Sequence, residues 1–175
     1  MRALIISADG FEDSELRVPL FGLKEAGIDV DVASVRHGQI VGEHGWRADV
    51  DKVLDEAHPE EYDLLVLPGG KAPALLRANP GVLGIARAFM AANKPVAAIC
   101  HGPQILVSAG EMRGRRATCF HTIAAELRDA GALYEDREVV VDGNLVTARQ
   151  PADLAPFIRE TIKCVHARAA AATVV

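Results

Sequence analysis

The stretch VAAICHGPQIL, residues 96–106, joins an apolar run to a segment that begins with helix-starting signals. Residues 96–99 carry no polar side chain, which is typical of a strand covered on both faces. Gly102 and Pro103 follow, and proline suits the first turn of a helix because no backbone N–H is needed there. The stretch therefore predicts a buried strand that turns sharply into a helix, with Cys100 at the corner.

Apolar strand patterns followed by helical patterns recur along the chain. Residues 3–7 and 63–67 are further, mostly apolar runs, and residues 28–35 alternate like a strand with one exposed face or an edge strand. Glycine-rich residues 36–46 predict a hairpin or an excursion, and residues 137–149 predict a hairpin that turns at Asp142 and Gly143. Helical patterns occupy residues 12–27, 79–94, 101–110, 122–131 and 151–167. Strands that alternate with helices predict an α/β fold, with an open, mostly parallel sheet and helices on both faces.

The length and the net charge of the chain exclude several classes of protein. The chain has 175 residues and a net charge of -5 with both signs scattered, which argues against a nucleic-acid partner and a membrane anchor. We expect one domain at residues 1–166 and a tail at residues 167–175 that frays or extends the last helix. The N-terminal residues read as a first strand and not a signal peptide, so we expect a cytoplasmic protein.

Three cysteines, Cys100, Cys119 and Cys164, are widely spaced and form no CxxC pair. This spacing argues against a metal site and against a disulfide framework. The case for a functional site is weak at Cys119 and at Cys164, and Cys164, among apolar neighbours in the last predicted helix, is interpreted as a packing residue. For Cys100, ordinary packing at a strand end competes with a role as nucleophile.

The corner at Cys100 favours the nucleophile. A tight strand-to-helix turn resembles the nucleophile elbow of hydrolases, and a helix N-terminus stabilises a thiolate. The backbone N–H of His101 and one from the turn at Gly69 and Gly70 could form an oxyanion hole. The His101 ring could serve the sulfur or turn away from it, because neighbours in sequence need not face each other.

Acidic residues follow the first predicted strand, at Glu12, Asp13 and Glu15. Favourable interaction with the helix dipole explains acids at this position. The alternative is that burial keeps Glu12 protonated, and that its carboxyl then shares a hydrogen bond with the Cys100 sulfur.

Together these motifs resemble a known family, the PfpI-type members of the DJ-1/PfpI superfamily. The resemblance spans roughly residues 2–165 and rests on ADGFEDSEL, YDLLVLPGGKAP, KPVAAICHGPQIL, AGEMRGRRAT and REVVVDGNLVTARQPADL. It implies a flavodoxin-like three-layer sandwich related to class I glutamine amidotransferases, working without a cofactor or metal. It implies Cys100 as reactive cysteine, Glu12 as its hydrogen-bonding acid, His101 as its paired histidine, and Gly70 and His101 as oxyanion-hole positions.

The resemblance also implies a range of activities and a homo-oligomer, either a dimer or a hexamer. We expect a cysteine hydrolase or lyase that acts on small reactive carbonyls or their adducts, as a glyoxalase or deglycase does. A peptidase acting on peptides or proteins, and a non-enzymatic redox sensor or chaperone, are the alternatives.

Two departures from the family pattern affect these alternatives. Ala74 occupies the position where peptidase-type members carry an acid for the histidine, which weakens the peptidase hypothesis. Phe120 stands where related sequences often carry tyrosine, so His121 could supply a base, although an exposed helix-start residue is the simpler interpretation. His44, in a glycine-rich loop, is a further accessory candidate.

Overall fold

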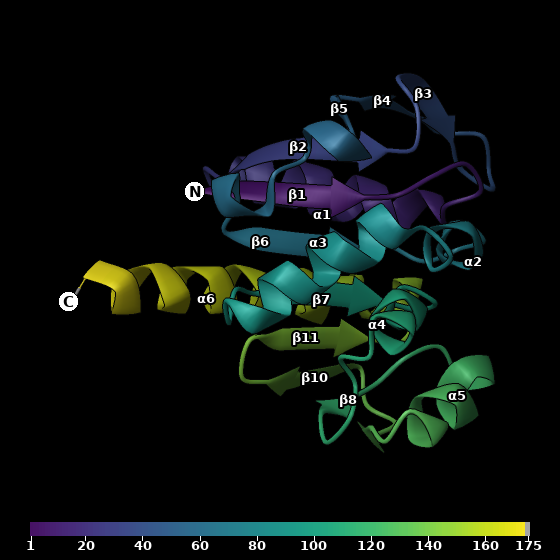
Figure 1. Ribbon diagram of the computed structural model, residues 1–175, viewed down its shortest axis with the longest axis vertical. Helices are drawn as coiled ribbons and strands as arrows, with labels where there is room; N and C mark the ends of the chain where they lie inside the picture. Colours follow the sequence, from purple (N-terminus) through teal and green to yellow (C-terminus); the bar gives the residue numbers. More distant parts are fainter. Residues whose placement is uncertain (174–175) are drawn as a thin grey trace.

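The computed structural model describes residues 1–173, with the chain drawn in Figure 1. Within that range a seven-stranded sheet has the order β10-β11-β7-β6-β1-β2-β5, in which β10 alone runs antiparallel to its neighbour. Its strands are β1 (Arg2–Ile6), β2 (Asp29–Ser34), β5 (Lys52–Val53), β6 (Leu64–Leu67), β7 (Val96–Ile99), β10 (Val139–Asp142) and β11 (Leu145–Ala148).

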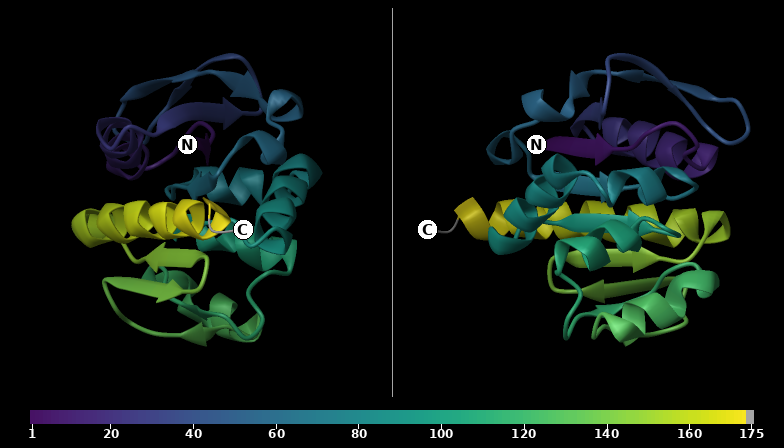
Figure 2. Two further views of the ribbon diagram at one scale, coloured as in Figure 1. Left: turned by 90° about the vertical axis from the view of Figure 1, so that its left-hand side faces the viewer. Right: turned by 45° about the vertical axis from the view of Figure 1, so that its right-hand side comes forward.

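Helices cover both faces of this sheet. They are α1 (Asp13–Glu25), α2 (Ala72–Leu76), α3 (Pro80–Ala91), α4 (Pro103–Ala109), α5 (Ala124–Asp129) and α6 (Leu154–Thr173). Helices α1 and α6 pack together on one face, and α3 and α4 pack together on the other (Figure 2). The predicted α/β sandwich is thus confirmed.

Smaller elements complete the chain. Two short pairs, β3 (Gly38–Val41) with β4 (Arg47–Val50) and β8 (Arg116–Ala117) with β9 (Leu133–Tyr134), lie outside the main sheet. Single 3-10 turns lie at Leu54–Glu56, Pro59–Glu61, His121–Ile123 and Pro151–Asp153. The short helix α2 and the β8–β9 pair were not predicted from the sequence, because segments of two to five residues carry too little periodicity.

The central strands are buried as expected. Every residue of β6 and β7 is fully buried, since both have strands on each side and helices above and below. Residues 28–35 are predicted to have one exposed face or to form an edge strand. In β2, Asp29 is exposed while Val30 and Val32 are buried, but the short β5 pairs with the end of β2 and forms the edge. Helix α6 continues to Thr173, so residues 167–173 of the predicted tail are helical, and residues 174–175 lie outside the described range.

Three features of this fold position the site. Strands β1, β6 and β7 are adjacent and parallel, so their carboxyl ends meet at one edge of the sheet. Helices α1, α2 and α4 begin just beyond those ends. Ligands of open α/β sheets bind at this edge. Separately, none of the helices within residues 1–173 has both the length and the apolar character needed to cross a membrane.

Candidate active site

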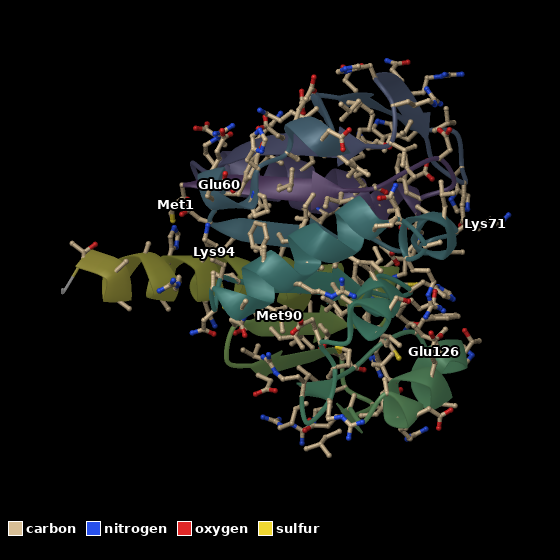
Figure 3. The ribbon with its side chains drawn as sticks, viewed as in Figure 1. Met1, Glu60, Lys71, Met90, Lys94 and Glu126 are labelled. Atoms are coloured by element: carbon tan, nitrogen blue, oxygen red, sulfur yellow. The ribbon has the colours of Figure 1, made fainter. Side chains whose placement is uncertain are left out.

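A cavity of about 630 Å³ opens at the carboxyl ends of β1, β6 and β7. Figure 3 shows Lys71, one of its lining residues, at this end of the sheet. Its walls are formed by Glu12, Glu15, Glu43, Gly70, Lys71, Ala74, Cys100, His101, Gln104, Phe120, Ile123 and Pro151. The cavity brings together residues from widely separated parts of the chain.

Cys100 sits on a strained corner directly after β7. Its φ angle is +62°, in the left-handed region that costs an L-residue about 1–2 kcal/mol. Two hydrogen bonds hold the corner: the Cys100 N–H donates to the Ala148 carbonyl, and the Phe120 N–H donates to the Cys100 carbonyl, each at 3.0 Å. Strain maintained by surrounding structure is a common feature of active sites. The predicted elbow therefore exists.

Glu15 is the carboxyl that meets the Cys100 thiol. The side chain is fully buried, and its Oε2 accepts a hydrogen bond from the Gly69 N–H at 2.8 Å. The carboxyl lies beside the Cys100 thiol and raises its pKa, and its Oε1 has no hydrogen-bond partner among residues 1–173. Burial, reinforced by the charge of Glu12, raises the pKa of Glu15 to about 8. Glu15 is accordingly protonated at neutral pH.

The ionisation of Cys100 depends on this neighbour. Burial raises the pKa of the thiol, and a charge on Glu15 raises it further. The backbone N–H groups of Gly70 and His101 act in the opposite direction, because they favour the thiolate. When Glu15 is protonated its repulsion disappears, so that burial alone opposes the thiolate while the two N–H groups favour it.

The structure corrects the expectation for Glu12. Its Oε2 accepts hydrogen bonds from the Ser14 hydroxyl at 2.5 Å and from the Glu15 N–H at 2.9 Å. Glu12 thus caps α1, while Glu15, one helical turn further on, reaches the sulfur. The sequence contains the signal for this arrangement, because Glu15 belongs to the buried stripe of α1 that continues through Leu16, Pro19, Leu20 and Leu23.

The His101 ring turns toward the sulfur. Its Nδ1 lies 3.3 Å from the Cys100 Sγ, and the ring packs against Phe120 with centroids 5.2 Å apart. Burial lowers the pKa of His101, although the charges of Glu43 and Glu126 oppose that change. A neutral imidazole can accept a proton, so the ring has both the position and the neutral state that a base requires.

Both predicted oxyanion donors face the sulfur of Cys100. Gly70 adopts a φ of +81°, which L side chains rarely adopt, and its backbone N–H faces Cys100. The His101 N–H also faces the sulfur. Two convergent N–H groups beside a nucleophile can stabilise the oxyanion formed when that nucleophile attacks a carbonyl.

The accessory candidates Gly69, His121 and His44 are not among the residues that line the cavity. The Gly69 N–H bonds Glu15, so it holds the acid and does not face the sulfur. The exposed His121 packs against Phe120 with centroids 4.4 Å apart, and it is not part of the cavity wall. The His44 side chain is 72% exposed beside Asp13 and is also outside the wall.

Three residues not selected from the sequence contribute to the cavity. Gln104 and Glu43 line it, and Glu126 bonds the Gln104 side chain at 2.8 Å. Gln104 follows Cys100 by four residues, a spacing that places both at one end of α4. Glu43 comes from the β3–β4 turn, and no local pattern in the sequence indicates its proximity to His101. Ala74 also lines the cavity, without an acid of its own.

Comparisons with known proteins identify the family. The DJ-1/PfpI family profile matches residues 1–164. The chain is 51% identical over 163 residues to a deglycase of Thermococcus kodakarensis, and 49% identical over 163 residues to the deglycase PfpI of Pyrococcus furiosus. Each alignment covers 93% of this chain and 98% of the relative.

A solved structure shows the same fold. The chain superposes with a TM-score of 0.91 and 39% identity on a two-domain protein from Anabaena variabilis, with DJ-1/ThiJ/PfpI-like and ferritin-like domains. The match covers 93% of this chain and 47% of that longer one. On the family match, the relatives and the shared fold, the chain belongs to the DJ-1/PfpI family.

Proposed function

We propose that this protein is a cofactor-independent cysteine enzyme that acts on small reactive carbonyls and their adducts, in the manner of a deglycase or glyoxalase. One observation carries the proposal: Cys100, on its strained corner, is met by the buried Glu15 carboxyl and by the His101 Nδ1 at 3.3 Å. Relatives that share about half of the residues are named deglycases, which supports the same chemistry.

The first chemical step is addition of the Cys100 thiolate to a carbonyl carbon. With a dicarbonyl such as methylglyoxal, an S–C bond forms at the aldehyde carbon and the carbonyl oxygen becomes an alkoxide. The N–H groups of Gly70 and His101 bind that alkoxide. Protonated Glu15 keeps the thiolate free from a neighbouring charge before the attack.

The second step is a proton transfer by His101. Its neutral ring takes the proton from the former aldehyde carbon and returns it to the adjacent ketone carbon. The product is a thioester of a 2-hydroxy acid on Cys100. Water then cleaves the thioester, releasing the hydroxy acid and regenerating the thiol. The net reaction adds one water to the dicarbonyl and needs no external oxidant or reductant.

Turnover of methylglyoxal to lactate tests the proposal. We expect the wild-type protein to produce lactate and Cys100→Ala to lose roughly 1000-fold in rate, as removal of a nucleophile usually causes. Cys164→Ala is the matched control, because Cys164 lines a separate hollow beside α6. Equal lactate production by the wild type and Cys100→Ala would contradict the proposal.

The peptidase alternative receives less support. A Cys-His peptidase needs an acid that orients the histidine, and Ala74 offers none on the cavity wall. Cleavage of a fluorogenic peptide that is lost in both Cys100→Ala and His101→Ala would favour it.

A redox-sensing role is favoured by one observation. The Glu15 carboxyl is buried and protonated beside the sulfur, so it can donate a hydrogen bond to a sulfinate formed at Cys100 by peroxide. Mass spectrometry after mild peroxide treatment tests this role, because it requires addition of two oxygen atoms to Cys100.

We also propose that the chain assembles with copies of itself. A groove of about 820 Å³ between α1 and α6 includes Val18 and the half-exposed Phe21. Pro151 lines both this groove and the active-site cavity, so a second copy in the groove would lie beside the site. Phe21→Glu is expected to shift the sedimentation of the protein to that of a monomer, whereas the control Val35→Glu should not. A wild-type monomer would contradict the assembly.

The free thiols of the described cysteines suit a reducing compartment, and we propose that the enzyme works in the cytoplasm.

A further inference from the structure

Gln104 lies one helical turn beyond the Cys100 corner and lines the same cavity. Its Nε2 donates a hydrogen bond to the Glu126 Oε2 at 2.8 Å. A carboxylate can only accept hydrogen bonds, so this contact determines which end of the Gln104 amide is the nitrogen. The orientation of the amide is thereby assigned from its partner.

Glu126 is itself firmly held. The Arg77 guanidinium bonds Glu126 Oε1, and Arg77 Nε donates to the Ser108 hydroxyl at 2.8 Å. Partial burial opposes ionisation of Glu126, but the bonds from Arg77 and Gln104 keep its pKa below the usual range. Figure 3 shows Glu126 on α5, which packs against α4. The network joins the end of α2 to α4 and α5.

The network leaves one atom of Gln104 without a partner. Within residues 1–173 no group donates a hydrogen bond to its Oε1, whereas its Nε2 bonds Glu126. Oε1 is also absent from the set of buried polar atoms that lack a partner, so it is not buried. It is therefore an accessible, neutral acceptor on the wall of the cavity. The donors facing Cys100 are the N–H groups of Gly70 and His101, which serve the attacked oxygen. Gln104 complements them with an acceptor.

We propose that Gln104 is a specificity-determining residue whose Oε1 accepts a hydrogen bond from the substrate. The selected class is carbonyl compounds that carry an O–H or N–H group on the carbon next to the carbonyl. This inference rests on the proposed function, since it names the substrate class of the same site.

The physical basis is the cost of an unpaired polar group. A substrate without a donor would displace water from Oε1 and would not replace the hydrogen bond that the water made. Sites that bond a substrate hydroxyl reject analogues lacking it far better than apolar pockets distinguish substrates of different size. The preorganised network strengthens the effect, because Gln104 cannot rotate to present its nitrogen without losing Glu126.

The test compares two ligands that differ in one group, hydroxyacetone and butanone. Each is used at increasing concentration to protect Cys100 from alkylation by iodoacetamide, in the full-length wild type and in Gln104→Met. Wild type should be protected better by hydroxyacetone. In Gln104→Met the ratio of the two protection constants should fall by about fivefold or more, the equivalent of one hydrogen bond.

A rescue variant separates recognition from structure. Gln104→Glu combined with Glu126→Gln reverses the hydrogen bond and restores an acceptor at position 104, so the preference for hydroxyacetone should return. The alkylation rate without ligand is measured for each protein, and each protection constant is taken relative to that rate. An unchanged ratio in Gln104→Met, or equal losses for both ligands, would overturn the inference. Failure of the proposed function would appear separately, as absence of lactate production by the wild type.

Discussion

The buried carboxyl of Glu15 and the thiol of Cys100 meet across the backbone of Gly69. A Cβ added to Gly69 would lie 2.5 Å from the Glu15 Oε2 and 2.8 Å from the Cys100 Cβ. The two groups are coupled, because the charge of Glu15 raises the pKa of the Cys100 thiol. Four predictions follow from this pair and from its surroundings.

Replacement of Glu15 by glutamine should move the titration of Cys100 to lower pH. In the wild type, Glu15 loses its proton near pH 8 and its charge then raises the pKa of the thiol, so the iodoacetamide reaction rate should rise only well above pH 8. In Glu15→Gln the rise should occur at a lower pH, since no carboxylate opposes the thiolate. Alkylation rates and ultraviolet thiolate absorption measure this. Identical profiles for the two proteins would contradict the coupling.

The same carboxyl should make stability depend on pH. The pKa of Glu15 rises from 4.5 to about 8 on folding, so the folded state holds more protons between these values. Stability should therefore fall as pH rises from 4.5 to 8, by an amount on the order of 3–5 kcal/mol from this group. Urea unfolding across this range should show the fall in the wild type. A comparable fall in Glu15→Gln would show that other groups cause the loss of stability.

Gly69→Ala should damage both stability and activity. The added Cβ would approach Glu15, Cys100 and the His101 N within 3 Å, and these are parts of the site that cannot move apart without breaking it. We expect a loss of roughly 2–3 kcal/mol, as for overpacking elsewhere, and a large loss of activity. Gly84→Ala is the matched control: Gly84 lies inside α3 with nothing within 4 Å, so this change should stabilise the protein by about 0.5–1 kcal/mol. Full activity in Gly69→Ala would refute this account of Gly69.

Glu43→Gln should lower the pKa of His101 further. Burial already lowers that pKa, and the charges of Glu43 and Glu126 oppose the change. Loss of one charge should extend the acidic limb of the activity profile toward lower pH, because His101 remains a neutral base there. An NMR titration of His101 checks this directly. Glu60→Gln is the control, since Figure 3 shows Glu60 at the opposite end of the sheet from Lys71. Equal shifts in both variants would exclude a local effect of Glu43.

Several features were predictable because they depend on local patterns. The buried strand at residues 96–99, the corner at Cys100 and the helix closed by Gly110 all follow from neighbouring residues, and the structure has them. The hairpin at Asp142 and Gly143 is likewise a local signal. Position within the sheet is harder to predict, because the alternation of β2 does not reveal that β5 pairs with the end of that strand.

The amino-acid sequence by itself determined the α/β architecture and the reactive corner, because apolar periodicity and turn chemistry act over a few residues. Only the tertiary structure decided which acid meets Cys100. Glu12 and Glu15 both precede the apolar stripe of α1, and the docking angle of that helix buries Glu15 while leaving Glu12 as its cap. Tertiary packing likewise turned the His101 ring toward the sulfur and brought Glu43 and Gln104 to the cavity. Such choices depend on contacts between distant segments, which no local pattern encodes.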